Sequence, residues 1–239
     1  MKRLVLGALA LAACNNDVDE PWELDHDRII AVRATPPGIV AGEQSKLDLL
    51  AGFTGGAPVV EKSPDLAQVV SPMSLADLVH NDGMGGWVVD APSDERLAAV
   101  RAELKLGATD PVELRVGVAS AWPTPVMSPM GNGFGAVKTV LLGVSAANPA
   151  LDGMMINGID PGTTDLVVPA MGKTPLFVQA DDTVNIVNWL TSAGTMHDFD
   201  LHNAYLTFEA EDMTEGQLAV VLRDPLGGVA WRFWSIRAQ

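Results

Sequence analysis

Residues 112–118 read VELRVGV, in which large apolar side chains alternate with charged or small ones. In an extended strand, successive side chains point to opposite faces, so the valines and the leucine of this stretch share one face. Glu113 and Arg115 then lie on the other face. Alternation of period two with one apolar face is typical of a strand that is half buried in a sheet. The stretch therefore predicts a β-protein.

The same alternation recurs on both sides of this stretch. Residues 46–53 carry apolar side chains at every second position, and residues 217–223 do so again near the C-terminus. Residues 224–228 follow with proline and two glycines, which predicts a hairpin loop leading to a last strand over residues 228–237. Short strands separated by turn signals describe a β-sandwich.

Two helices are expected between the strands of the N-terminal half. Residues 74–80 have apolar side chains at helical spacing, and residues 93–106 show the same stripe more clearly. Ser93 is a residue type that caps helix N-termini, and Gly107 is the type that commonly ends a helix. We therefore expect helical insertions in the first of two sandwiches.

A turn-rich stretch at Ala146–Pro149 predicts a boundary between two domains. On this division, residues 28–145 form a first sandwich with helical insertions and residues 148–239 form a second. The predicted fold class is mainly all-β, with two sandwiches in tandem. Each is expected to have its own core, with few contacts crossing the boundary.

The N-terminus carries a basic pair, a short apolar run and then LAAC at positions 11–14. Together these resemble the signal of a bacterial lipoprotein, in which the cysteine is acylated and starts the mature protein. The apolar run is far shorter than the ~20 residues that a membrane-spanning helix needs. An ordinary secretory signal would need no cysteine at the cleavage site. The resemblance implies that residues 1–13 are a signal peptide and that Cys14 carries the lipid.

The residues after Cys14 are polar and acidic, and residues 14–27 are expected to form an acidic tether. Asn15 directly after the cysteine implies an address in the outer membrane of the cell envelope. Cys14 is the only cysteine, so no disulfide can form within the chain.

Charge excludes one class of partner. The formal net charge is −15 and the isoelectric point is about 4.4. Nucleic-acid binding depends on basic side chains that neutralise phosphates, so this chain is not expected to bind nucleic acid. Anionic lipid headgroups are unfavourable for the same reason, and contact with a membrane is expected only through the lipid.

Both ends of the chain resemble one group of proteins. Residues 28–37, followed by Ala-Gly-Glu at 41–43, are similar to the opening strand and turn of Ig-like domains in lipoproteins of myxobacteria and their relatives. Residues 220–232 are similar to their closing hairpin, and Trp189 stands where the family has a tryptophan in mid-sheet. The resemblance implies Ig-like sandwiches and a lipid-anchored location, and it implies no reaction. The cysteine pair of antibody domains is missing.

Residues 196–202 read MHDFDLH and contain the best candidate for a metal site. In an extended segment, Asp198, Asp200 and His202 share a face, and carboxylates and imidazoles are metal ligands. The alternative, which we favour, is a polar loop between strands, because the spacing matches no established zinc motif. Trp234 is a second candidate binding residue, since an exposed tryptophan in the last strand would bind a glycan or a partner protein.

These observations favour a non-enzymatic, lipid-anchored envelope protein with a structural or protein-interaction role and no cofactor. Its expected partners are the membrane, through Cys14, and an envelope protein or glycan. The alternative is a surface module that binds a glycan or a metal ion. A secreted hydrolase is the weakest alternative. Residues 143–147 come near the nucleophile-elbow pattern, but Asn148-Pro149 follows where a helix would be needed.

Overall fold

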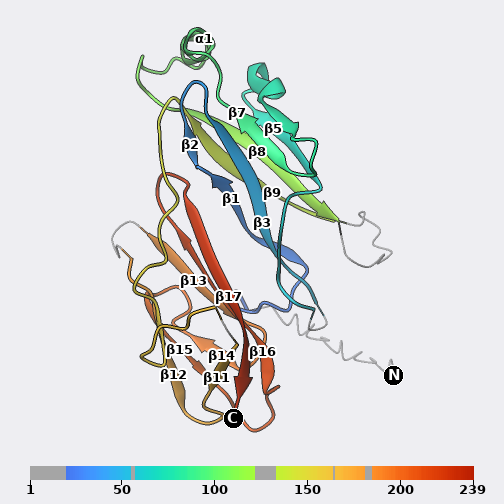
Figure 1. The fold of residues 1–239 in the computed structure, drawn as a ribbon, viewed down its shortest axis with the longest axis vertical. Helices are drawn as coiled ribbons and strands as arrows, with labels where there is room; N and C mark the ends of the chain where they lie inside the picture. The colour runs from blue at the N-terminus through green and yellow to red at the C-terminus, as the bar shows by residue number, and fades with distance from the viewer. Residues whose placement is uncertain (1–19, 55–56, 122–132, 164, 181–184) are drawn as a thin grey trace, which may run out of the picture.

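A computed structural model describes residues 20–54, 57–121, 133–163, 165–180 and 185–239 of the chain. Its sheets form two Ig-like β-sandwiches that follow each other along the long axis of the molecule (Figure 1). The predicted fold class, tandem all-β sandwiches with helical insertions in the first, is confirmed.

The first sandwich consists of two sheets. One has the strand order β1-β3-β7-β6, with β4 also paired to β3, and the other has the order β2-β9-β8-β5. The strands of the first sheet are β1 (Arg28–Thr35), β3 (Gln44–Gly52), β4 (Val60–Lys62), β6 (Val79–Asn81) and β7 (Trp87–Asp90). Those of the second are β2 (Gly38–Ile39), β5 (Leu66–Ser71), β8 (Val112–Ala121) and β9 (Gly133–Leu142).

The second sandwich also has two sheets, with the orders β10-β12-β15-β14 and β11-β17-β16-β13. The strands of the first are β10 (Met155–Ile156), β12 (Lys173–Phe177), β14 (Thr195–His197) and β15 (Asn203–Thr207). Those of the second are β11 (Leu166–Val168), β13 (Ile186–Thr191), β16 (Glu215–Arg223) and β17 (Val229–Ala238). β16 and β17 form the predicted hairpin, with Arg223 opposite Val229.

Each sandwich encloses an apolar core between its sheets. In β8 the side chains of Val112, Leu114 and Val116 are fully buried, as the alternation predicts. In the second core Trp189 is fully buried, and its Nε1 donates a hydrogen bond to the carbonyl of Leu201 over 3.2 Å. Side chains of one face of each sheet thus supply the cores.

The helix predicted at 93–106 is present, whereas the one predicted at 74–80 is only a short 3₁₀ segment, and residues 79 and 80 belong to β6. The 3₁₀ segment is η1 (Met73–Leu78), and the helix is α1 (Asp94–Leu104), where the Ser93 side chain accepts a hydrogen bond from the backbone N–H of Arg96. The end of α1 differs from the prediction, because Lys105, and not Gly107, adopts the left-handed conformation after the last turn. None of the helices in the described residues is long and apolar enough to cross a membrane.

The prediction that residues 14–27 form an acidic tether is wrong for residues 20–27. Residues 20–27 lie against the second sandwich, where Leu24 is 2% exposed. The backbone N–H of Leu24 donates to the carbonyl of Thr191 over 2.8 Å, and Thr191 donates back to the carbonyl of Trp22 over 2.9 Å. This segment therefore extends the sheet beyond β13, because the edge strand offers unpaired backbone groups.

Candidate functional site at the junction

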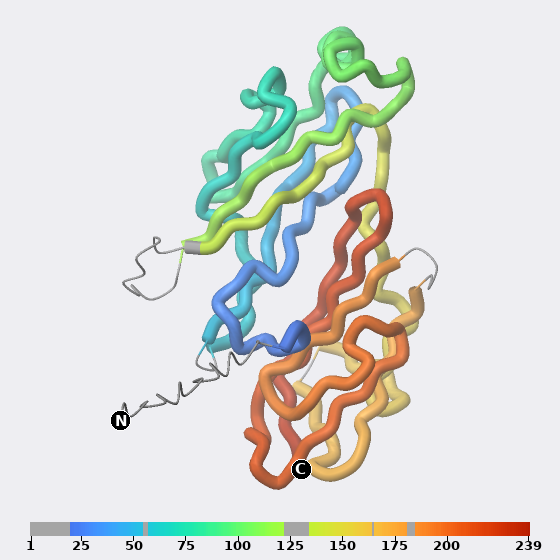
Figure 2. Tube along the Cα trace, turned by 180° about the vertical axis from the view of Figure 1, so that it is seen from behind, coloured from blue at the N-terminus to red at the C-terminus, as the bar shows by residue number. Residues whose placement is uncertain are grey.

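The two sandwiches meet through the outer faces of two sheets. β1 and β3 of the first sandwich lie against β16 and β17 of the second (Figure 1; Figure 2 gives the view from behind). The contact has its own buried apolar cluster, formed by Leu24, Ala31, Leu50, Val59, Leu190, Ala219, Val221, Val229 and Trp231. The expectation of few contacts between the two halves is therefore wrong.

The sequence of β16 explains why this strand takes part in two cores. Residues 218–222 are Leu-Ala-Val-Val-Leu, apolar at every position, and all of them are buried. Leu218, Val220 and Leu222 face the core of the second sandwich. Ala219 and Val221 face the junction. A strand covered on both faces has a continuous apolar sequence, whereas a half-exposed strand alternates.

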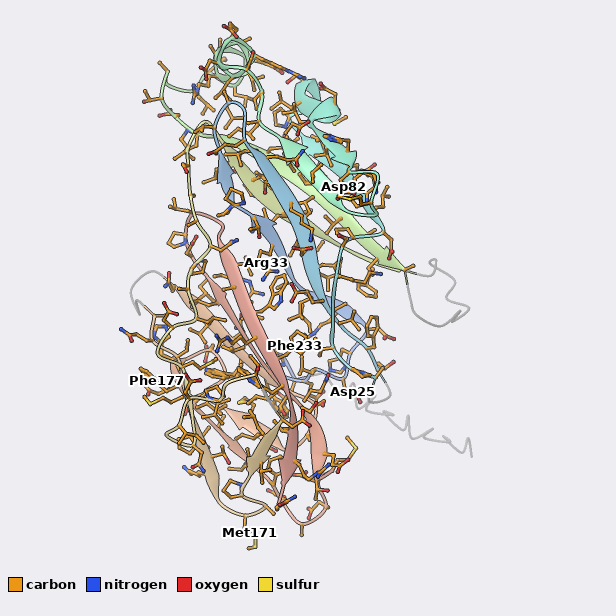
Figure 3. All side chains as sticks on the ribbon, viewed as in Figure 1. Asp25, Arg33, Asp82, Met171, Phe177 and Phe233 are labelled. Carbon is orange, nitrogen blue, oxygen red and sulfur yellow. The ribbon has the colours of Figure 1, made fainter. Side chains whose placement is uncertain are left out.

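Trp231 is the largest side chain of the junction. The guanidinium of Arg33, on β1, lies 4.1 Å from the centre of its ring. The indole Nε1 donates to Glu61 Oε2 over 2.9 Å, and an Arg33 nitrogen lies 2.5 Å from Glu61 Oε1. Figure 3 shows Arg33 and Phe233 in the region where the sandwiches meet. A buried indole needs a partner for its N–H and its face attracts a cation, so the first sandwich satisfies both requirements of Trp231.

Polar side chains add further links across the junction. Asn148, in the connection between the sandwiches, donates from Nδ2 to the carbonyl of Ala34 over 2.9 Å. Its Oδ1 accepts from the backbone N–H of Val229 over 2.9 Å. Gln217 Oε1 accepts from the backbone N–H of Val59 over 2.6 Å. These bonds join backbone groups of both sandwiches and so restrict their relative orientation.

The predicted metal ligands lie in a turn. Asp198 has a φ of 55°, and the backbone N–H of Leu201 donates to the Asp198 carbonyl over 2.9 Å. The segment is therefore not extended, and the argument that placed Asp198, Asp200 and His202 on one face does not apply. Throughout the described residues no three histidine, cysteine or acidic side chains are grouped so as to hold a metal ion.

Trp234 is buried, and the prediction of an exposed binding residue is wrong. Its side chain is 4% exposed and belongs to the core of the second sandwich, and its Nε1 donates to the carbonyl of Gly162 over 3.1 Å. Trp231 and Trp234 do lie on opposite faces of β17, as their spacing predicts. Both rings are buried, however, Trp231 in the junction and Trp234 in the core of the second sandwich.

Cys14, the predicted lipidation site, lies outside the described residues. Residues 143–147 follow β9 without starting a helix, so the arrangement that a nucleophile elbow requires is not formed there.

No family model and no curated protein matches the chain. Among solved structures, the tandem Ig repeats of Dlar share 11% identity over 87% of this chain and 97% of that one, with a TM-score of 0.29. Fibronectin(III)-like modules of CbhA from Clostridium thermocellum share 9% over 87% and 94%, with a TM-score of 0.26. A nucleoside hydrolase-related hypothetical protein from Saccharophagus degradans shares 15% over 39% of this chain and only 26% of its own length, with a TM-score of 0.30. These superpositions are too loose to carry a functional argument.

Proposed function

We propose that this protein is a lipid-anchored protein of the bacterial cell envelope, located in the outer membrane, with a structural or protein-interaction role. The motif at positions 11–14 supports the anchor, and the resemblance to myxobacterial Ig-like lipoproteins agrees with it. The observation that carries the interaction role is the junction. Two sandwiches joined by an apolar cluster and by Trp231, Glu61 and Asn148 form one elongated body that presents loops at both ends. Loops held on a rigid scaffold are the usual contact surfaces of such modules.

The geometry also limits how far this body extends from the bilayer. Six peptide units separate Cys14 from Glu20, and each spans at most about 3.6 Å, so the reach is about 22 Å at most. Residues 20–27 pack beside the junction, between the ends of the molecule. A lipid on Cys14 would hold the middle of the protein near the membrane, with both sandwiches close to the surface.

Fractionation of cells tests the anchor. Wild-type protein is expected in the outer-membrane fraction and Cys14→Ser in the soluble fraction, because the lipid supplies the apolar chains that hold the protein. Metabolic labelling with a fatty-acid analogue should mark the wild type alone. Wild-type protein that takes up no label would refute the anchor.

A cross-linking comparison tests the interaction role. A photo-reactive residue at exposed Met84, in the first sandwich, or at exposed Met171, in the second, should give a discrete adduct in intact membranes. Trp231→Ala, which loosens the junction, should reduce adducts that need both sandwiches. The absence of any discrete adduct at either end would argue against the role.

A further inference from the structure

A cavity of about 390 Å³ lies beside the apolar cluster of the junction. β1 and β9 of the first sandwich line one side, and the start of β13 and the β16–β17 hairpin line the other. Its polar lining includes Lys138, Arg223 and Asp224. Ile30 of β1 and Ile186, which is 59% exposed and lies opposite Arg223, add apolar lining. The size falls within the range of small-molecule sites.

Lys138 is a buried cation whose hydrogen-bonding capacity is largely unused. It pairs with Val116 across β9 and β8, so its side chain lies on the core side of the sheet and is 5% exposed. Its Nζ donates to the carbonyl of Gly227 in the hairpin, the one acceptor that the described residues offer it. An ammonium group has three N–H donors, so two remain for a ligand. Burial lowers the pKa of Lys138 to about 8, and the nearby Arg223 adds to this while Asp224 opposes it.

Arg223 is held in place by neutral oxygens. One terminal nitrogen donates to Asn188 Oδ1 over 2.5 Å and the other to the carbonyl of Ile30 over 3.0 Å. Ile30 is the extra residue of a β-bulge, since Ile29 and Ala31 pair with consecutive residues of β3. A bulged residue leaves the ladder, which frees its carbonyl for this contact. Within the described part of the chain, no carboxylate forms an ion pair with Arg223 or Lys138.

Among the described residues of the lining, Asp224 supplies the only negative charge, and the hairpin already uses it. Its Oδ1 accepts hydrogen bonds from the backbone N–H groups of Leu226 and Gly228, both over 2.8 Å. The two cations and one carboxylate of the described lining have a net charge of about +1, in a chain whose net charge is −15. Buried charges are normally paired, so the lining lacks one negative charge.

We propose that this cavity binds a small monoanionic carboxylate with an apolar body. The carboxylate accepts hydrogen bonds from Lys138 and Arg223, and the apolar body lies against Ile30 and Ile186. A single charge balances the lining, whereas a phosphate dianion would exceed it beside Asp224. The proposal does not depend on the lipid anchor or on the interaction role.

Calorimetric titration of the full chain carrying Cys14→Ser, which needs no detergent, tests the site with hexanoate as the probe. Three matched probes each lack one property of hexanoate. Hexanamide lacks the charge, acetate lacks the apolar body, and inorganic phosphate is not restricted to a single negative charge. We expect hexanoate to bind saturably with a dissociation constant below about 10 mM, and each of the other three probes to bind at least about tenfold more weakly. Hydrogen bonds to a charged partner are strong enough to produce such a difference.

Two kinds of variant locate the binding. Lys138→Met keeps the length of the side chain and removes its charge, so it should weaken hexanoate binding at least about tenfold. The control is Lys173→Met on β12, in the sheet of the second sandwich that does not line the cavity, and it should leave binding unchanged. Ile186 is exposed, so Ile186→Asp and Ile186→Lys should both fold. Ile186→Asp should weaken binding and Ile186→Lys should strengthen it, because the first adds a negative charge and the second a positive charge beside the bound carboxylate.

Several results would overturn the proposal. No saturable hexanoate binding by the wild-type cavity, or equal binding of hexanamide, would exclude a carboxylate site. Tighter binding of phosphate than of hexanoate would exclude a monoanionic one. Binding that survives Lys138→Met and shifts in the same direction in both Ile186 variants would place the ligand elsewhere.

Discussion

Strands β8 and β16 each lie inside a four-stranded sheet, yet their side chains are buried in different ways. In β8 buried residues alternate with exposed or half-exposed ones, and Glu113 and Arg115 face solvent. In β16 five consecutive residues, 218–222, are buried. The difference arises because the outer face of β8 has no covering layer among the described residues, whereas the outer face of β16 packs on the first sandwich.

The comparison separates two kinds of apolar side chain that a hydrophobicity count treats alike. Val220 stabilises the second sandwich itself, and its neighbour Val221 stabilises the attachment of one sandwich to the other. The same division holds on β17 for Trp234 and Trp231. Substitutions at these neighbouring positions should therefore have different consequences.

The largest expected contrast is between Val220→Asp and Val221→Asp. An unpaired carboxylate in the core of the second sandwich should prevent that sandwich from folding, because its burial costs several kcal/mol. Val221→Asp should separate the sandwiches and leave both cores intact. Near-UV circular dichroism and small-angle scattering distinguish unfolding from separation.

Limited proteolysis adds a second readout to this comparison, and it also tests the predicted division into domains at residues 28–145 and 148–239. Val221→Asp should expose Ala146–Pro149 to cleavage and release two stable pieces, since the links across the junction are weakened. If Val221→Asp loses the second sandwich as completely as Val220→Asp does, the two faces of β16 are not independent.

The next contrast compares Trp234→Ala with Trp231→Ala. Loss of a fully enclosed tryptophan typically costs about 3–5 kcal/mol, and we expect the free energy of unfolding to fall by about 4 kcal/mol for Trp234→Ala. Trp231→Ala should lower it by about 2–3 kcal/mol, because the junction can partly close around the gap. Urea denaturation measures both, and an equal loss in the two variants would contradict the distinction.

Much of the fold could be predicted from local patterns. Alternation identifies β8, the residue type of Ser93 identifies the start of α1, and Pro-Leu-Gly-Gly after Asp224 identifies the hairpin. These signals act over a few residues, where side-chain direction and backbone conformation follow from the chain itself. The end of α1 at Lys105 shows the limit, since the left-handed position fell on a residue with a side chain.

The junction could not be predicted in the same way, because it joins residues far apart in the sequence. The apolar run at 218–222 was a usable signal that β16 is covered on both faces, but nothing in it identifies Arg33 and Glu61 as the partners of Trp231. The extended geometry assumed for the candidate metal ligands is wrong for a related reason. Alternation places Asp198 and Asp200 on one face only in a strand, and here the chain turns.

A smaller effect is expected from the buried charge at the edge of the junction. The pKa of Lys138 is lowered to about 8 by burial, below its ordinary value of 10.5. Between these values the unfolded state binds more protons than the folded one, so stability should rise with pH relative to Lys138→Met. Of the two charged groups that face this ammonium, Asp224 raises the pKa of Lys138 and Arg223 lowers it. The rise amounts to at most about 3 kcal/mol between pH 8 and 10.5, and parallel unfolding curves of the two proteins would contradict it.

The smallest contrast returns to the outer face of β8. Asn148→Ala removes the side chain that bonds both Ala34 and Val229, and the loss of such bonds costs about 1–2 kcal/mol. Arg115→Ala on exposed β8 should change the free energy of unfolding by less than about 0.5 kcal/mol. Hydrogen exchange shows where each protein is destabilised. The backbone N–H of Val229 should exchange faster in Asn148→Ala, while the amides of β8 keep their protection. A stability loss in Arg115→Ala as large as that in Asn148→Ala would mean that a further layer covers β8, and the contrast with β16 would not hold.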